Sequence, residues 1–358
     1  MHTIKIFFHK YEATLSALTL FLGFIFDYFT LNRIDFFWDN FFIVLYLLCS
    51  GIGIVIINLY ESGKLPKEIF ENVYTFLPFL IQFAFGGLFS AFVVFYSKSA
   101  SLFTSGAFVL ILLALLVGNE FFKERYSKLV FQVGIYFVSV FSFSIFFIPV
   151  LTKKMGAGTF LLSGLVSLGL ISVLIFIIYR FTPERYQGNA RFLAVTVLGL
   201  YIFINILYFA NIIPPIPLSL KAGDVYHSVE KKSSGQYVAV GEVDTWREKF
   251  GGVQSVHLRA GEPVYVFSSV FAPTELQIDI VHDWQYLNLE GKWVSATKIT
   301  FPIRGGRNEG YRGFSKKENI FPGHWRVDVA TTRGQVIGRV RFDIEITDTP
   351  ILLKQETL

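Results

Sequence analysis

The sequence predicts a multi-pass α-helical membrane bundle followed by an all-β, sandwich-like soluble domain. Two observations carry this prediction. Residues 1–213 hold long apolar runs, whereas residues 214–358 alternate polar and apolar side chains and contain most of the charged ones. The whole chain is 53% hydrophobic and 16% charged, although an average soluble domain carries about 25% charged residues. Two separate environments, a bilayer and water, account for this division.

Seven segments of the first part are candidates for membrane-spanning helices, each of which needs about 20 mostly apolar residues. The first segment contains Asp27, lacks a small-residue cleavage site and is followed by further spans. We therefore interpret it as a retained helix and not as a signal peptide. The predicted spans are residues 12–31, 40–59, 77–97, 100–118, 129–150, 158–180 and 192–213.

The loops between these segments differ in their content of basic residues. One alternate set, which begins at the N-terminus, holds ten Lys and Arg residues, and the other set holds four. Cytoplasmic loops carry the excess of Lys and Arg, so we expect the N-terminus in the cytoplasm. After seven crossings, the C-terminal domain would lie outside the cytoplasm. Much of the net charge of +5 lies in these loops, and we expect no nucleic acid among the partners.

The spans contain few side chains that would suit transport. Asp27 is the ionisable candidate, and a solvated carboxylate at the interface is the simpler interpretation. Gln82 and Asn205 are uncharged and suit hydrogen bonds between helices. The pattern F-x-x-E-R-Y occurs at residues 121–126 and 181–186, in two loops predicted to be cytoplasmic. Such loops either dock a partner or anchor the helices at the lipid headgroups.

The second part begins with Pro-Pro-Ile-Pro and a polar stretch, which predict a linker over residues 214–236. Short alternating runs follow, separated by turns, and they predict a β-sandwich over residues 237–358, of which an immunoglobulin-like fold is one form. The single cysteine, Cys49, excludes an intramolecular disulfide. The predicted strands are residues 237–243, 253–259, 263–271, 275–284, 293–302, 311–315, 323–331 and 335–347.

Basic residues outnumber acidic ones from Lys298 to Arg341. The Gly-rich loop around Arg307 leads into a segment with Arg312 and Lys316. A loop of this kind can bring backbone N–H groups and guanidinium groups toward an anion. The alternative interpretation is a solvated strand face.

Four of the five tryptophans lie in this domain, and Trp284 and Trp325 are two of them. Buried tryptophans usually pack between two sheets. An exposed pair would instead form a platform on which sugar rings stack, so both tryptophans are also candidates for ligand contact.

Catalysis has little support in the sequence. His282 and His324 are the acid–base candidates, but His282 and Asp283 are adjacent on a predicted strand and point to opposite faces. No hydrolase, zinc-protease, phosphate-loop or paired-carboxylate motif occurs. We therefore predict no catalytic residue, no metal and no cofactor.

Motifs near the C-terminus resemble a bacterial domain family of unknown function, DUF2914. The shared pattern is a Trp after a His, an R-x-x-S-K segment, G-x-W-x-V and a last strand that ends in Phe. Arg312, Ser315 and Lys316 match R-x-x-S-K directly. The resemblance implies a bacterial envelope protein, with the bundle in the inner membrane and the C-terminal domain in the periplasm, and it implies no activity. The matching segments are residues 282–284, 311–317, 322–329 and 334–342.

The favoured hypothesis is a membrane-anchored extracytoplasmic recognition module of the bacterial envelope. Besides the lipid bilayer, its partner would be an anionic glycan, a lipid headgroup or an envelope protein. One alternative is a transporter-like or lipid-handling protein in which the bundle is the working part, and another is an envelope enzyme that uses His282 or His324. The candidate ligand-binding residues are Trp284, Arg307, Arg312, Ser315, Lys316 and Trp325.

Overall fold

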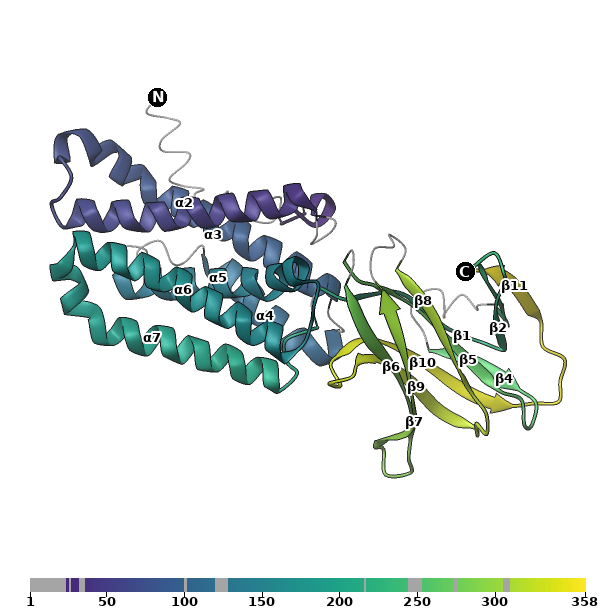
Figure 1. The fold of residues 1–358 in the computed structure, drawn as a ribbon. Coiled ribbons are helices and arrows are strands. Elements are labelled where there is room, and N and C mark those ends of the chain that lie inside the picture. Colours follow the sequence, from purple (N-terminus) through teal and green to yellow (C-terminus); the bar gives the residue numbers. More distant parts are fainter. Residues whose placement is uncertain are drawn as a thin grey trace, which may run out of the picture. The chain divides into compact units, whose positions relative to one another are not determined.

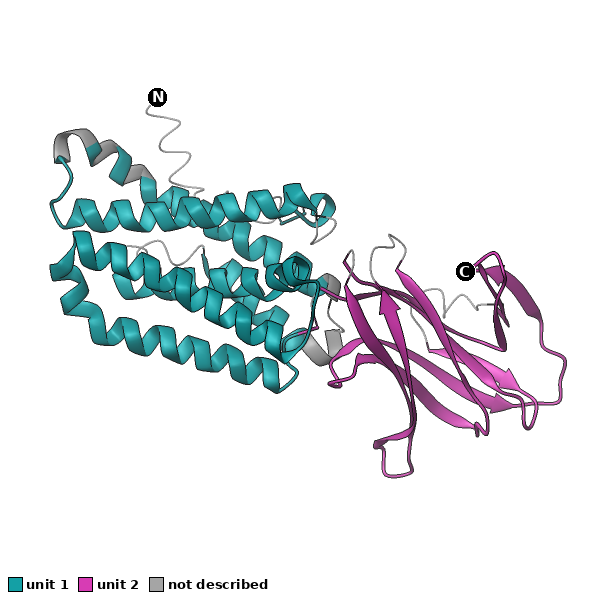
Figure 2. Cartoon of the chain, in the orientation of Figure 1, with its two compact units in different colours: residues 1–98, 105–213 teal, residues 99–104, 214–358 magenta. Residues whose placement is uncertain are grey.

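The chain divides into two compact units, which Figure 2 shows in different colours. The helical unit comprises residues 1–98 and 105–213, and the β unit comprises residues 99–104 and 214–358. Each unit is described by itself. The computed structural model describes residues 24–25, 27–31, 36–99, 102–119, 128–215, 217–243, 253–273, 276–304 and 310–358.

Among the described residues, five helices are long and apolar enough to cross a membrane, and the apolar part of α4, Gly106–Gly118, is shorter. The predicted multi-pass bundle is thus confirmed, with fewer full-length spans than the seven predicted. Most of the predicted span 12–31 lies outside the described residues. The helices are α2 (Phe37–Glu61), α3 (Lys67–Ser99), α4 (Leu102–Gly118), α5 (Leu129–Thr152), α6 (Ala157–Phe181) and α7 (Pro183–Phe209) (Figure 1).

Helix α7 begins well before the predicted start at residue 192 and ends before the predicted end at residue 213. Its first residue is Pro183, whose fixed φ and missing N–H suit the first position of a helix. The sequence predicted a loop before residue 192, and this segment contains the charged residues Glu184, Arg185 and Arg191. The charged residues instead form the first turns of the helix.

The helices pack closely around α5, which contacts α2, α6 and α7. Two glycines of α2 permit this approach. A Cβ at Gly51 would lie 2.8 Å from the Tyr136 hydroxyl of α5, and a Cβ at Gly53 would lie 2.7 Å from a side-chain carbon of Ile81 in α3. Aromatic rings fill the interface between α3 and α5, where Phe95 and Phe146 have centroids 5.6 Å apart.

The outward faces of α6 and α7 are strongly apolar. Phe176 of α6 is 62% exposed, and Val195 and Ile206 of α7 are 64% and 59% exposed. Many other Leu, Ile, Val and Phe side chains on these helices are also exposed. A soluble monomer rarely presents such a continuous apolar surface, whereas hydrocarbon chains of a bilayer would cover it.

The β unit contains three sheets, and all eight predicted strands are present. A five-stranded sheet has the order β4-β10-β9-β6-β7, and two three-stranded sheets have the orders β1-β5-β8 and β11-β3-β2. Among the strand pairs of the described residues, β4 and β10 are parallel and the others are antiparallel. The strands are β1 (Ser219–Tyr226), β2 (Ser228–Lys231), β3 (Tyr237–Glu242), β4 (Gln254–Leu258), β5 (Val264–Phe271), β6 (Gln277–Leu287), β7 (Trp293–Arg304), β8 (Tyr311–Lys317), β9 (Gly323–Thr331), β10 (Val336–Ile346) and β11 (Leu353–Thr357) (Figure 1).

The predicted linker over residues 214–236 is wrong in its extent. Strands β1 and β2 occupy most of it, and the connection from α7 to the first strand runs only from the end of α7 at Phe209 to the start of β1 at Ser219. The polar stretch after β2 is a tight turn, in which Lys232 N–H donates to the Gln236 carbonyl and Gly235 has a φ of +84°. A turn and a linker share the same polar, Gly-containing composition. Here the pairing of β1 with the distant strand β5 distinguishes them, and the local sequence does not show that pairing.

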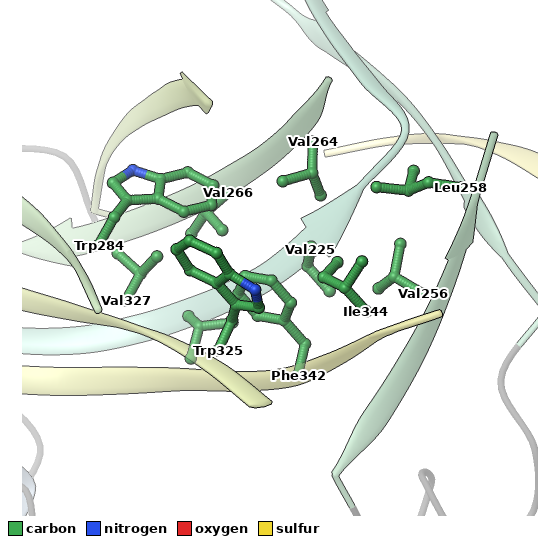
Figure 3. Close-up of a cluster of buried hydrophobic side chains, with 11 residues drawn as sticks. Val225, Val256, Leu258, Val264, Val266, Trp284, Trp325, Val327, Phe342 and Ile344 are labelled. Carbon is green, nitrogen blue, oxygen red and sulfur yellow. The ribbon is translucent and has the colours of Figure 1, made fainter. Parts of the chain in front are cut away.

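The main core lies between the five-stranded sheet and the sheet β1-β5-β8. Figure 3 shows Val266 of β5, Trp284 of β6 and the rings of Trp325 and Phe342, which come from β9 and β10. The other face of β5 is also buried, because Tyr265 and Phe267 pack against side chains of β2 and β3. The middle sheet is therefore covered on both faces, and the sandwich has a third layer.

Candidate functional site

The described members of the six predicted ligand-binding residues lie on different faces of the β unit. Arg307 lies outside the described residues. Ser315 points into the core toward the five-stranded sheet, where it meets Trp284. Arg312 and Lys316 lie on the opposite face of the same strand, because side chains alternate along β8. Trp325 is 1% exposed and belongs to the core.

A buried polar network joins the two main sheets. His282 of β6 is fully buried, and its Nε2 lies 2.8 Å from the Ser268 hydroxyl of β5. Its Nδ1 lies 2.7 Å from the Ser315 hydroxyl of β8, which also accepts a hydrogen bond of 3.0 Å from the indole N–H of Trp284. The edge of the imidazole meets the Phe301 ring at a centroid distance of 4.9 Å.

Burial lowers the pKa of His282 to about 3, so the imidazole is neutral at physiological pH. A neutral imidazole donates with one nitrogen and accepts with the other, and a hydroxyl can serve as the partner of either. Both nitrogens are satisfied and no part of the ring is exposed. The arrangement therefore suits a structural bridge between sheets and gives the imidazole no contact with a solvent-borne substrate.

Arg312 and Lys316 have partners within the β unit. The Arg312 guanidinium donates to the Leu358 carbonyl at 3.1 Å, and the Tyr237 hydroxyl donates to the Arg312 carbonyl at 3.0 Å. Lys316 donates to the Glu318 carboxylate at 2.6 Å and lies over the Tyr265 ring. Their role as ligand contacts stays a prediction, but the contacts also explain them as parts of the packing between β8 and its neighbours.

The outward face of the five-stranded sheet carries a second group of charged residues. On β9, Arg326 and Asp328 alternate with the core residues Trp325, Val327 and Val329.

Strand β10 continues this face, since Arg339 and Arg341 alternate with the core residues Val340 and Phe342. In the strand register, Arg326 is the partner of Arg341 and Asp328 is the partner of Arg339. We call Arg326, Asp328, Arg339 and Arg341 the arginine face.

Arg326 is held in place before any ligand arrives. Its Nε and Nη2 donate to the Gln285 amide oxygen at 2.9 and 2.7 Å. Its guanidinium lies 4.3 Å from the centroid of the Trp293 ring, a tryptophan of the outward face and not of the core. Burial lowers the pKa of Arg326, and Arg339 and Arg341 lower it further, whereas the carboxylates of Asp328 and Asp283 raise it.

Asp328 is the acidic member of the arginine face. It is 5% exposed, because two guanidiniums cover it. Arg339 donates to both carboxylate oxygens, at 2.5 and 2.8 Å, and Arg326 lies 3.7 Å away. The four residues of the arginine face comprise three guanidiniums and one carboxylate, which is a formal net charge of +2. Beside it, Asp283 of β6 and Lys298 of β7 are register partners with opposite charges.

A chain of polar contacts outside the core connects His227, which lies between β1 and β2, with β3, β4 and β10. The Glu242 carboxylate lies 3.0 Å from His227 Nε2 and 2.8 Å from His257 Nδ1, and it accepts from the His257 backbone N–H at 2.6 Å. His257 Nε2 lies 3.5 Å from the Glu345 carboxylate. Burial raises the pKa of Glu242, but the hydrogen bonds from His227 and His257 outweigh it and place the pKa below its usual 4.5.

This depressed pKa predicts a loss of stability in acid. The unfolded chain takes up a proton at Glu242 more readily than the folded chain, so the stabilisation is present above about pH 4.5 and is lost as the pH falls through the lower folded pKa. The unfolding midpoint of the wild type should therefore fall more steeply below pH 4.5 than that of Glu242→Gln. Parallel curves for the two proteins would contradict this role of Glu242.

The second F-x-x-E-R-Y segment contributes to the helical unit. Arg185 forms an ion pair with Glu61 at the end of α2, and the Tyr74 hydroxyl of α3 donates to the same carboxylate at 2.8 Å. The segment thus ties three helix ends together. The first segment, residues 121–126, lies outside the described residues, and docking of a cytoplasmic partner stays a prediction.

The polar residues of the spans have partners within the helical unit. The Ser90 hydroxyl donates to Asp27 at 2.5 Å. The side-chain amide of Gln82 donates to the backbone carbonyl of Asn119 at 3.4 Å. In return, the side-chain amide of Asn119 donates to the backbone carbonyl of Gln82 at 2.9 Å. Asn205 differs from the prediction, because it donates to the Tyr201 carbonyl of its own helix. Across the described parts of both units, no three His, Cys, Asp or Glu side chains are grouped as metal ligands.

Comparison with known proteins gives a family match for part of the chain. No curated protein matches the chain significantly. Among solved structures, an immunoglobulin-like protein from Pseudomonas aeruginosa is 12% identical and covers 36% of this chain and 96% of its own, with a TM-score of 0.21. The alkylpurine DNA glycosylase AlkC of Pseudomonas fluorescens, bound to DNA, is 10% identical and covers 88% of this chain and 100% of its own, with a TM-score of 0.22. Both TM-scores lie below 0.5, and the fold assignment rests on the strand pairing described above.

The family match lies in the β unit. Residues 277–344 match the model of a protein family of unknown function, DUF2914. This segment runs from the start of β6 to near the end of β10, and it includes His282, Ser315 and the whole arginine face. The match falls in the part of the C-terminal unit whose sequence motifs resemble DUF2914, and it confirms that resemblance.

Proposed function

We propose that this protein is a membrane-anchored recognition module of the bacterial envelope, whose arginine face binds an anionic ligand. The observation that carries the proposal is the pairing of Arg326 with Arg341 on adjacent strands. Like charges directly opposite each other destabilise a sheet. Within the arginine face, the Asp328 carboxylate accepts two hydrogen bonds from Arg339 and lies 3.7 Å from Arg326. An anion that binds there would relieve the repulsion.

The binding surface is separate from the residues that hold the β unit together. Arg341 and Lys298 are exposed, so a change at either position leaves the core intact. Arg326 is fixed by Gln285 and Trp293, which reduces the entropy lost on binding. The separation of these charged residues from the core supports a recognition surface displayed on a rigid sheet.

Binding to a polyanion tests the proposal. The full-length protein in detergent should bind dextran sulfate at low ionic strength, and Arg341→Gln should weaken that binding by about tenfold, since a hydrogen bond to a charged group contributes about 1.5–3 kcal/mol. Fluorescence anisotropy of labelled dextran sulfate measures the affinity. Lys354→Gln on β11 is the matched control, with the same change in charge at an exposed site. Equal weakening by both substitutions would contradict a specific face.

We place the β unit in the periplasm and the bundle in the inner membrane, on the basis of the basic residues of the loops. Leu289 tests this placement, since it lies fully exposed in the β6–β7 turn. In a Cys49→Ser chain, Leu289→Cys should react with a membrane-impermeant maleimide in intact cells. Lys64→Cys, in the connection between α2 and α3, should react only after the inner membrane is opened. If Lys64→Cys reacted in intact cells and Leu289→Cys reacted only after the inner membrane was opened, the proposed topology would be contradicted.

The alternative hypotheses have less support from the described residues. The ionisable side chains named above in the helical unit, Asp27, Glu61 and Arg185, have partners within that unit. His282 is enclosed, and His324 lies in an exposed pair with Asp343 at 2.6 Å. These contacts favour neither transport through the bundle nor catalysis at a histidine.

A further inference from the structure

We infer that β11 can leave its own chain and pair with β3 of a second copy, so that two chains exchange this strand. Strand β11 lies at the end of the sheet β11-β3-β2, and among the described strands it pairs with β3 alone. Its five residues have register partners from Val238 to Glu242. A strand added at a sheet edge through main-chain hydrogen bonds can be replaced by any chain that offers the same extended backbone.

Few side chains hold β11 in place. Leu353 is 47% exposed, and the preceding Leu352 is 76% exposed. Lys354 and Glu356 form an ion pair at 3.8 Å, and ion pairs at the surface stabilise a fold weakly. Because little apolar surface is buried along the strand, it should open at a much lower free-energy cost than the rest of the β unit.

The last residues of the chain make specific contacts with the rest of the β unit. Leu358 packs against the aromatic cluster that contains Tyr237, and its N–H donates to the Tyr237 carbonyl at 2.9 Å. Its carbonyl accepts from the Arg312 guanidinium at 3.1 Å. The Tyr226 hydroxyl donates to the Glu356 carboxylate at 2.7 Å. The edge of β3 is therefore an acceptor site for one particular segment, and the same segment of a second copy can make every one of these contacts.

The segment between β10 and β11 suits an exchange. It comprises residues 347–352, and Figure 1 shows it as a loop outside the sheets. Pro350 has a fixed φ and biases the backbone of Thr349 toward an extended conformation. Six extended residues span at most about 20 Å, so the strand can reach a copy that lies directly alongside.

Exposed apolar side chains beside this segment favour a second copy as the occupant. Ile346 at its start is 41% exposed, and Leu352 and Leu353 at its end are exposed as well. In an exchanged pair the two connecting segments cross near the two-fold axis, where these side chains can cover one another. An unrelated peptide would leave them in water. The contacts of β11 are broken and formed again in the exchange, so the newly covered apolar surface favours the pair.

The test uses chains in which Cys49→Ser removes the single native cysteine. One chain carries Val240→Cys on β3, and a second chain, with a tag that changes its size, carries Gln355→Cys on β11. These positions are register partners with Cα atoms about 4.5–5.5 Å apart, a distance that a disulfide spans. Both full-length chains are produced in the same cells, purified in detergent and oxidised with diamide, and the products are separated on a non-reducing gel.

We expect a covalent heterodimer. Its yield should exceed by about tenfold the yield from Val240→Cys with Leu289→Cys, because paired thiols have a high effective concentration. Leu289 lies fully exposed in the β6–β7 turn, so its cysteine measures collision between chains.

A chain that carries both Val240→Cys and Gln355→Cys is the matched control. Its disulfide should form within one chain and should prevent exchange, because it fixes β11 on its own β3. An internal disulfide in this chain, with no heterodimer above the Leu289→Cys level in the mixture, would overturn the inference. Failure of the internal disulfide would contradict the pairing of β3 with β11 and would overturn it too. An adduct of Val240→Cys with another protein and none with the second copy would assign the edge of β3 to a different strand.

Discussion

Replacement of His282 by alanine should lower the stability of the β unit by about 3–5 kcal/mol, the range of buried polar networks and core cavities. The substitution removes a buried ring and leaves the Ser268 hydroxyl without its partner. It also removes one of the two hydrogen bonds at Ser315, the hydroxyl that receives the Trp284 indole. An unsatisfied buried hydroxyl alone costs about 1–3 kcal/mol.

Tryptophan fluorescence during thermal unfolding measures this effect, since four of the five tryptophans lie in residues 214–358. His324→Ala is the matched control, because His324 is 65% exposed and its loss should change the midpoint little. Similar midpoints for His282→Ala and the wild type would show that the network does not hold the sheets together.

The same histidine predicts a pH dependence. The folded pKa of His282 is about 3, whereas its usual value is 6.5. Below pH 6.5 the unfolded chain therefore binds a proton that the folded chain does not, and the β unit loses about 1.4 kcal/mol for each pH unit down to the folded pKa. The wild type should lose stability between pH 6.5 and 4.5, and His282→Asn should lack this component. An equal slope in both proteins would contradict a neutral, buried imidazole.

Trp325→Ala should have the second large effect, a loss of about 3–5 kcal/mol, as for other buried aromatic side chains. The ring is 1% exposed, packs against Phe321 and Tyr286, and donates its N–H to the Phe321 carbonyl at 2.9 Å. Lys317 also lies over it. Trp325 was a candidate for ligand contact in the sequence, and the structure assigns its bulk to the core.

Trp293→Ala is the matched control for this substitution. Trp293 lies on the outward face, where it supports Arg326, so its loss should cost the fold little but should weaken anion binding. Thermal unfolding and polyanion affinity together separate the two roles. A stable Trp325→Ala variant that fails to bind would restore Trp325 as a ligand contact.

The strands of the β unit could be predicted well because alternation is a local property. In β5, Val264 and Val266 face one neighbour and Tyr265 and Phe267 face another, and the sequence shows the same period of two. The sequence could not show that both faces are covered. That depends on β2 and β3, which lie in a stretch whose composition also fits a linker.

The candidate site was predicted less well, because the spacing of the motif residues along one strand separates their side chains. Arg312 and Ser315 are three positions apart on one strand, so they must point to opposite faces. The motif R-x-x-S-K therefore combines a core residue with two residues of the other face. Its spacing alone argued against a single ligand site.

The arginine face was only partly accessible from the sequence. Arg326, Arg339 and Arg341 all lie in the basic stretch, and the alternation with Val327 and Val340 places them outward. The register that sets Arg326 beside Arg341 and Asp328 beside Arg339 is a property of two paired strands. The network at His282 likewise joins β5, β6 and β8, and no local pattern connects those segments.

The central claim is that the anion binds the outward face of the five-stranded sheet and not the edge strand β8. The most direct test compares Arg341→Gln with Lys316→Gln, two exposed sites with the same change in charge, in dextran sulfate binding by the full-length protein. We predict a loss of about tenfold for Arg341→Gln and no significant change for Lys316→Gln. A loss confined to Lys316→Gln would contradict the account and return the ligand to β8.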